Sequence, residues 1–78
     1  MRTLATPKQP LRQLRKCAAM NIHRRRRYLQ LTKEQCACRA GVSLRHWKLY
    51  ENGRGQIALH TLLNISFALQ MQPHELLQ

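Results

Sequence analysis

One stretch constrains the fold of this chain most, Leu31–Gly53, which reads LTKEQCACRAGVSLRHWKLYENG. Thr32 is a favoured N-cap residue, and Gln35 stands three residues later, where a capping box has Glu or Gln. Gly41 is typical of a helix C-terminus that turns into the left-handed region. Ser43 can then cap a second helix, which the Asn-Gly pair at the end of the stretch terminates. The stretch therefore predicts two short helices joined by a tight turn.

A helix, a tight glycine-containing turn and a second capped helix are the parts of a helix-turn-helix, here at about residues 32–52. The second helix of such a motif can lie in the major groove of DNA. The charge of the chain agrees, because fourteen Lys and Arg residues face only three acidic ones, a net charge of +11. This surplus predicts a polyanionic partner, with nucleic acid as the first candidate and an anionic membrane surface as the second.

The pattern LTKEQCA-x-x-AGVS-x-x-x-W-x-x-YENG resembles the helix-turn-helix of the phage repressor and Cro class, the XRE-like family of DNA-binding transcription regulators. The resemblance continues through Leu59–Leu69 and Met71–Leu77, which are similar to the family's core helix and its short closing helix, and it covers the chain from Asn21 to Gln78. It implies an all-α fold: a compact five-helix repressor-like DNA-binding domain with a basic N-terminal extension.

The N-terminal part divides into an arm and an added helix. Met1–Gln9 has no periodic apolar pattern, which predicts a mobile basic arm, whereas Leu11 and Leu14 begin an apolar stripe at helical spacing. We therefore expect residues 1–16 to be a basic arm, partly disordered or helical, and residues 17–78 to be the helix-turn-helix domain. Whether the helix runs unbroken from Leu11 or breaks around Met20–Asn21 stays open.

The remaining apolar residues predict the core. Trp47 falls where the family buries an apolar side chain. Tyr50 is expected to pack rather than to read bases, and Cys36 is expected to be a small core residue. Leu59–Leu69 is the most apolar predicted helix, and Pro73 suits the first turn of a last short one. Leu76 and Leu77 then close the core or lie in a dimer seam. Since the chain has no alternating β-branched run, no sheet is predicted.

The resemblance implies that the exposed face of the second motif helix reads bases in the major groove. Arg45 is the best candidate for a base contact, because a guanidinium can donate to both O6 and N7 of guanine. Leu44 stands where relatives often carry a polar residue, and it can only pack on a thymine methyl group. The candidate base contacts are Leu44, Arg45, Lys48 and Leu49, although Lys48 could equally reach a phosphate.

The phosphate contacts implied by the resemblance lie at both ends of the motif. Unpaired N–H groups and the helix dipole favour an anion at the start of the first motif helix. A glycine after the second helix lets the backbone come close to a phosphate. The candidate residues are Thr32, Lys33, Ser43, His46, Asn52, Arg54 and Gly55.

The densest charge cluster is His23–Arg27. On a helix its arginines point in several directions, so a phosphate contact and a solvated basic face remain open for Arg24, Arg25 and Arg27. Arg26 differs, because the family often pairs an arginine at this place with the acidic residue that ends the second motif helix. That residue is Glu51, and a structural ion pair between the two is expected.

Neither a metal site nor an enzyme is expected. The four histidines are scattered one to each predicted element, without the pairing that a zinc site needs. Three cysteines form no disulfide framework, and three acidic residues offer little for acid–base catalysis. We expect no cofactor. The chain also has no long apolar run and no apolar signal segment, so a cytoplasmic protein without a membrane partner is expected.

These features favour a sequence-specific regulator of transcription that binds double-stranded DNA. The expected form is a homodimer on a palindromic operator, acting as a repressor, with the dimer surface open between the last helix and the N-terminal extension. The alternative is a protein-binding module, such as the antitoxin of a toxin–antitoxin pair, with a toxin or polymerase as its partner. Leucines on the reading face, Leu44 and Leu49, favour that alternative. A cationic peptide that binds RNA or a membrane surface is a third possibility.

Overall fold

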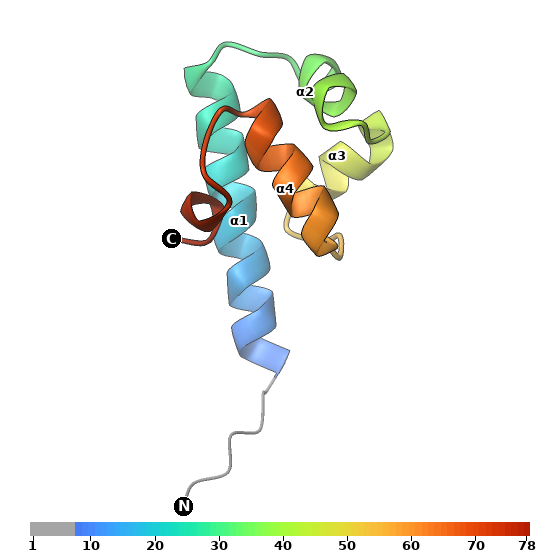
Figure 1. The fold of residues 1–78 in the computed structure, drawn as a ribbon. Coiled ribbons are helices and arrows are strands. Elements are labelled where there is room, and N and C mark those ends of the chain that lie inside the picture. The colour runs from blue at the N-terminus through green and yellow to red at the C-terminus, as the bar shows by residue number, and fades with distance from the viewer. Residues whose placement is uncertain (1–7) are drawn as a thin grey trace, which may run out of the picture.

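The computed structural model describes residues 8–78, with side chains from Leu11 onward. Most of the predicted arm over Met1–Gln9 thus lies outside the described residues. In chain order the elements are α1 (Lys8–Tyr28), α2 (Lys33–Ala40), α3 (Leu44–Glu51), α4 (Leu59–Ala68) and the 3-10 helix η1 (Pro73–Leu77), as Figure 1 shows. The predicted all-α, compact fold is confirmed for the described residues. Over residues 8–78 the expected count of five helices is slightly off, because four elements are α-helices and the last one is a 3-10 helix.

Helix α1 is unbroken at Met20–Asn21, where the sequence left a break open, and also at the expected division between residues 16 and 17. It comprises 21 residues, a length of about 30 Å. Only its C-terminal part is held by the core, through Ala18, Ala19 and Ile22. Its N-terminal half extends away from the other helices (Figure 1). The interior of α1 has no glycine, and Pro10 lies in the first turn, where proline is tolerated.

Local hydrogen bonds define the ends of α2 and α3 as the sequence predicts. The Oγ1 atom of Thr32 accepts from the backbone N of Gln35 (3.0 Å), and Gln35 Oε1 accepts from the backbone N of Thr32 (2.8 Å). Gly41 ends α2 with φ of 71°, in the left-handed region. Ser43 Oγ accepts from the backbone N of His46 (3.1 Å) at the start of α3. The turn between the helices is therefore only three residues long, Gly41–Ser43.

Two glycines after α3 fit the following loop against the body of the domain. Gly53 has φ of 72°, and a Cβ atom there would lie 3.6 Å from Ala19 of α1. Gly55 is packed more tightly, because a Cβ atom would lie 2.8 Å from Cδ1 of Tyr50. The sequence interpretation assigned the missing side chain of Gly55 to the approach of a phosphate. In the structure, the missing side chain of Gly55 instead lets the loop pack closely against the Tyr50 ring.

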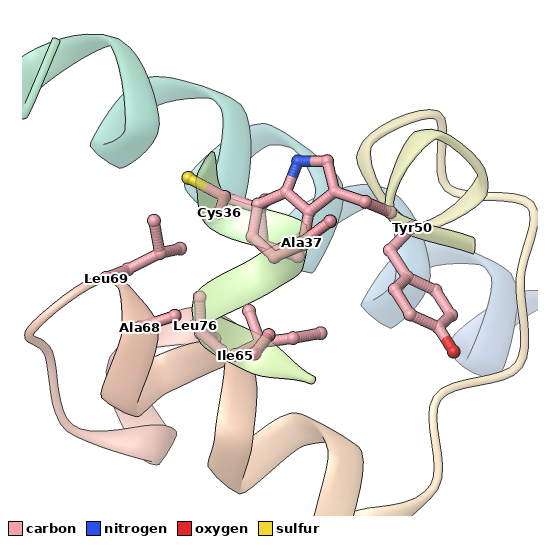
Figure 2. Close-up of a cluster of buried hydrophobic side chains, with 10 residues drawn as sticks. Cys36, Ala37, Tyr50, Ile65, Ala68, Leu69 and Leu76 are labelled. Carbon is pink, nitrogen blue, oxygen red and sulfur yellow. The ribbon is translucent and has the colours of Figure 1, made fainter. Parts of the chain in front are cut away.

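The core lies where α1, α2, α3, α4 and η1 converge. Its largest fully buried side chain is Trp47, and Ile22, Ile65, Leu69 and Leu76 are buried equally well. Figure 2 shows side chains from α2, α4 and η1 gathered in this cluster, with the Tyr50 hydroxyl pointing away from the others. The predicted burial of Trp47, Tyr50 and Cys36 is confirmed. Leu76 belongs to the core, whereas Leu77 is exposed.

Side chains of α1 complete the ends of two C-terminal elements. Arg25 donates from Nε to the carbonyl oxygen of Leu69 (2.9 Å) and from Nη2 to that of Gln70 (3.0 Å), just after α4. Asn21 donates from Nδ2 to the carbonyl oxygen of Leu76 (2.9 Å) in η1. Buried carbonyl groups at helix ends need such partners. Within residues 8–78, no helix has both the length and the apolar character to cross a membrane.

Substituting Gly55→Ala tests the contact with the Tyr50 ring. A methyl group at 2.8 Å must displace a buried aromatic side chain, which is expected to lower the free energy of unfolding by about 1–3 kcal/mol. Chemical denaturation without any ligand measures the change. The matched control is Gln56→Ala in the same loop, at an exposed position, where less than about 0.5 kcal/mol is expected. Equal stability of both variants and the wild type would contradict this packing.

Candidate nucleic-acid interface

The solvent-facing side of α3 is cationic. Arg45 and Lys48 are exposed there, while Trp47 and Tyr50 on the opposite side are buried. This division follows from helical periodicity, since residues three or four apart share a face. The two cations can therefore reach a ligand without any change in the packing of α3.

The two leucines predicted on the same face are placed differently. Leu44 and Leu49 are each half-buried, and neither is among the exposed large apolar side chains of the described residues. The backbone oxygen of Leu49 also accepts from the backbone N of Arg54 (3.0 Å), which folds the following loop onto it. Both leucines are thus only partly accessible on this face, which weakens the case for a protein-binding groove at α3.

A buried carboxylate fixes the orientation of α3. Glu51, the last residue of α3, has a side chain that is 3% exposed. Its oxygens accept from Arg26 through Nε (2.7 Å) and Nη2 (3.1 Å), a bidentate contact from α1. The indole Nε1 of Trp47 donates to the same carboxylate, and His23 Nδ1 lies 2.9 Å from it. Arg26 also donates to the carbonyl oxygen of Leu31 (2.9 Å), just before α2. One ion pair thus joins α1, α3 and the entrance to α2.

The environment of Glu51 keeps it charged. Burial by itself raises the pKa of the carboxyl group, but the hydrogen bonds from Arg26, His23 and Trp47 oppose this and hold the pKa below its ordinary value of 4.5. The hydrogen bond to Glu51 also raises the pKa of Arg26. Both partners are therefore ionised at neutral pH, and the contact is a true ion pair.

The start of α2 is one end of the predicted phosphate contacts. Thr32 is exposed, and its hydroxyl oxygen accepts from Gln35, which leaves the hydroxyl hydrogen to be donated outward. The amide groups at the first two positions of α2 have no acceptor within the helix. Lys33 is half-buried, and Glu34, exposed in the same turn, carries a negative charge. The free amide groups, the Thr32 hydroxyl and the ammonium group of Lys33 can therefore all contact an anion at this end, while the carboxylate of Glu34 opposes its binding.

The loop after α3 is the other end. Asn52 and Arg54 are both exposed, and Gly55 is half-buried under Tyr50. The connection into α2 and the end of α3 are linked by Arg26, which donates both to Leu31 and to Glu51. The exposed groups of both segments can donate to an anionic backbone.

Ser43 and His46 are engaged with each other at the start of α3. Ser43 Oγ lies 2.7 Å from Nδ1 of His46, and the imidazole ring lies 6.2 Å from the ring of Tyr50, centroid to centroid. Both residues are exposed. The pairing holds the imidazole in place and leaves its Nε2 atom as the one available for a contact.

The basic cluster of α1 divides by role. Arg25 is held by the carbonyl groups after α4 and lies 5.1 Å from the ring of Tyr28, so it is a structural residue. Arg24 and Arg27 are exposed. Arg24 lines a shallow hollow with Asn21 and Glu75, on the side of α1 that η1 covers. Arg24 is thus a surface cation on a different side of α1 from His23 and Arg26, which contact α3.

Sequence reasoning missed the capping role of Arg25 and Asn21 and the contact between His23 and Glu51. Of these, only the contact between His23 and Glu51 could have been inferred from the sequence. His23 stands three residues before Arg26 and so lies on the same face of α1. The roles of Arg25 and Asn21 depend on carbonyl groups 44 and 55 residues away in the sequence. Nothing in the local sequence indicates such partners.

The described residues hold no group of three or more His, Cys, Asp or Glu side chains arranged for a metal ion. The three cysteines are free thiols. Burial raises the pKa of the Cys36 thiol, which keeps it protonated and unreactive. A comparison of the chain with models of protein families, with curated proteins and with solved structures found no match.

The ion pair at Glu51 predicts a pH-dependent stability. Because the pKa of Glu51 is lower in the folded chain, the charged carboxylate stabilises the fold above about pH 4.5, and this contribution is lost as pH falls through the folded pKa. The variant Glu51→Gln leaves Arg26 unpaired and should lower the free energy of unfolding by about 3 kcal/mol at pH 7. Denaturation of both proteins between pH 7 and pH 3 measures the difference, which should shrink as the pH falls.

Glu34→Gln serves as the control, since Glu34 is exposed at the start of α2. Its effect should stay below about 1 kcal/mol. A wild-type advantage over Glu51→Gln that is constant across the pH range would contradict the assignment of this stability to a buried carboxylate.

Proposed function

We propose that this protein is a sequence-specific regulator of transcription that binds double-stranded DNA with α3 in the major groove. The observation that carries this proposal is the arrangement of α3, which presents Arg45 and Lys48 to solvent while its opposite side is fixed by Trp47 and Glu51. A reading helix must hold its side chains in a defined position against base edges, because the hydrogen bonds that discriminate bases are directional.

Charge and end geometry support the same function. A net charge of +11 on 78 residues favours a polyanion. Thr32 precedes α2, and Asn52 and Arg54 follow α3. Their exposed side chains can donate to phosphates of the DNA backbone beside the groove that α3 enters. Phosphate contacts of this kind set the position of a protein on DNA, while base contacts supply the specificity.

The proposed mode of action is repression from a palindromic operator bound by two copies, with the cytoplasm as the compartment. A symmetric pair of reading helices matches a symmetric site, which is the usual reason that such operators are palindromic. A protein-binding module remains the second candidate. The observation that favours it is the exposure of large apolar side chains on α4.

The decisive experiment is selection of binding sites from a pool of random duplexes, followed by affinity measurements on the selected site and on an unrelated duplex of equal length. We expect the selected site to be preferred at low and at moderate salt. Arg45→Ala should reduce that preference by about 1–3 kcal/mol at one base pair of each half-site, because it removes a bidentate contact. The DNA that precedes the gene itself is the natural second template.

Arg24→Ala is the matched control, because it removes one exposed positive charge from the side of α1 that η1 covers. It should leave the preference for the selected site unchanged. If wild-type protein binds both duplexes equally and releases both together as salt rises, binding is due to charge alone and the proposed reader function is wrong. Equal losses of preference in Arg24→Ala and Arg45→Ala would contradict the role of α3.

A further inference from the structure

The outer face of α4 carries an apolar stripe that the domain itself does not cover. Leu59 is 85% exposed, Leu63 56% and Phe67 84%. These residues are four apart, so they follow one another along one face of the helix. The opposite face is buried against the core through Thr61, Ile65, Ser66 and Ala68. We call the three exposed residues the α4 stripe.

Contiguous exposed apolar surface on a small protein marks an interaction site. The α4 stripe continues at Leu59 into an open groove of about 340 Å³ between the N-terminal half of α1 and the segment that precedes α4. Most of its lining is apolar, from Leu11, Leu14, Ala18, Ile57, Leu59, Leu62 and Leu77, and Arg15 and Gln56 complete it. Stripe and groove together form an apolar surface that extends from α4 to the projecting half of α1.

Charge identifies the partner that this surface fits. All fourteen Lys and Arg residues lie between Arg2 and Arg54, and no Asp, Glu, Lys or Arg occurs from Gly55 to His74. Two copies of so cationic a chain repel each other over most of their surface, but not where both present the uncharged α4. An acidic partner protein would gain little from the α4 stripe, because this stripe carries no cation. The occupant that suits this face is a second copy of the chain.

The spacing of the α4 stripe is also self-complementary. In a two-fold symmetric contact, residue i of one copy meets residue j of the other, and j meets i. If two α4 helices pack antiparallel about an axis at Leu63, the two Leu63 side chains meet each other. Leu59 of each copy then meets Phe67 of the other. The smaller side chain faces the larger one at both ends, so the contact closes with two copies.

We propose that the α4 stripe is the surface through which two copies of this chain pair, with α4 antiparallel to α4 across a two-fold axis at Leu63. Pairing is a property of the protein without DNA, whereas its role at an operator rests on the function proposed above. Neither surface considered from the sequence alone, the last helix or the N-terminal extension, is at the centre of this contact. The extension contributes only at the edge, through the groove beside Leu59.

Sedimentation equilibrium of the purified full chain without DNA tests the pairing. We expect wild-type protein to have twice the 9.2 kDa mass of one chain. Leu63→Lys places two like charges against each other at the axis and should weaken the dimer on the order of 100-fold. The control is Met20→Lys on α1, a residue that is 60% exposed and lies outside the stripe and the groove. It adds the same charge and should leave the mass unchanged.

A charge exchange tests the antiparallel arrangement. Leu59→Lys alone and Phe67→Lys alone should each give monomers, whereas Leu59→Lys combined with Phe67→Glu should restore the dimer, because each lysine then meets a glutamate of the other copy. Circular dichroism establishes that each variant is folded. A wild-type protein that is monomeric at all concentrations, or a dimer that Leu63→Lys leaves intact, would overturn the inference.

The two proposals fail separately. A monomer that still prefers its selected DNA site would overturn the α4 pairing and leave the reader function in place. A dimer that is disrupted by Leu63→Lys but binds all duplexes equally would leave the pairing in place and overturn the reader function. A dimer that also loses affinity for the palindromic site in Leu63→Lys, but not in Met20→Lys, would support both.

Discussion

The carboxylate of Glu51 is the point on which the position of α3 depends. It accepts hydrogen bonds from Arg26 of α1 and from Trp47 of its own helix, and Arg26 extends the connection to the carbonyl oxygen of Leu31 before α2. A buried carboxylate is stable only when several donors surround it. Both helices of the motif are thus oriented by one charged group, and the exposed face of α3 takes its direction from a contact on its hidden side.

Each of the three acidic residues of this strongly basic chain has a local interaction that stabilises its negative charge. Glu51 pairs with Arg26, Glu34 lies in the first turn of α2, where the helix dipole favours it, and Glu75 accepts from the backbone N of Gln72 at the start of η1. None of them lies on α3 except at its buried end. The exposed face of α3 therefore keeps its positive charge, because no acidic side chain on that face neutralises Arg45 or Lys48.

Charged and apolar surfaces are divided along the chain. Apart from Arg2, the Lys and Arg residues lie in α1, α2, α3 and the loop that contains Arg54, while α4 and the segments next to it contain no Lys, Arg, Asp or Glu. This division gives the domain two chemically different surfaces, one suited to a polyanion and one suited to an apolar contact. A protein that both binds DNA and pairs with itself needs such a separation, because a cationic pairing surface would repel its own copy.

The sequence by itself determined the ends of α2 and α3 and the tight turn between them, because Thr32, Gly41 and Ser43 act on backbone groups within four residues. The burial of Trp47 also followed from the sequence, through its position in the helix-turn-helix pattern. Tertiary structure alone decided which side of α4 is exposed, since leucines or other apolar residues occur all around that helix and periodicity cannot choose among them. It also decided that Arg25 and Asn21 complete distant helix ends and that Leu44 and Leu49 are half-buried. Those outcomes depend on contacts between segments far apart in the chain, which no local pattern records.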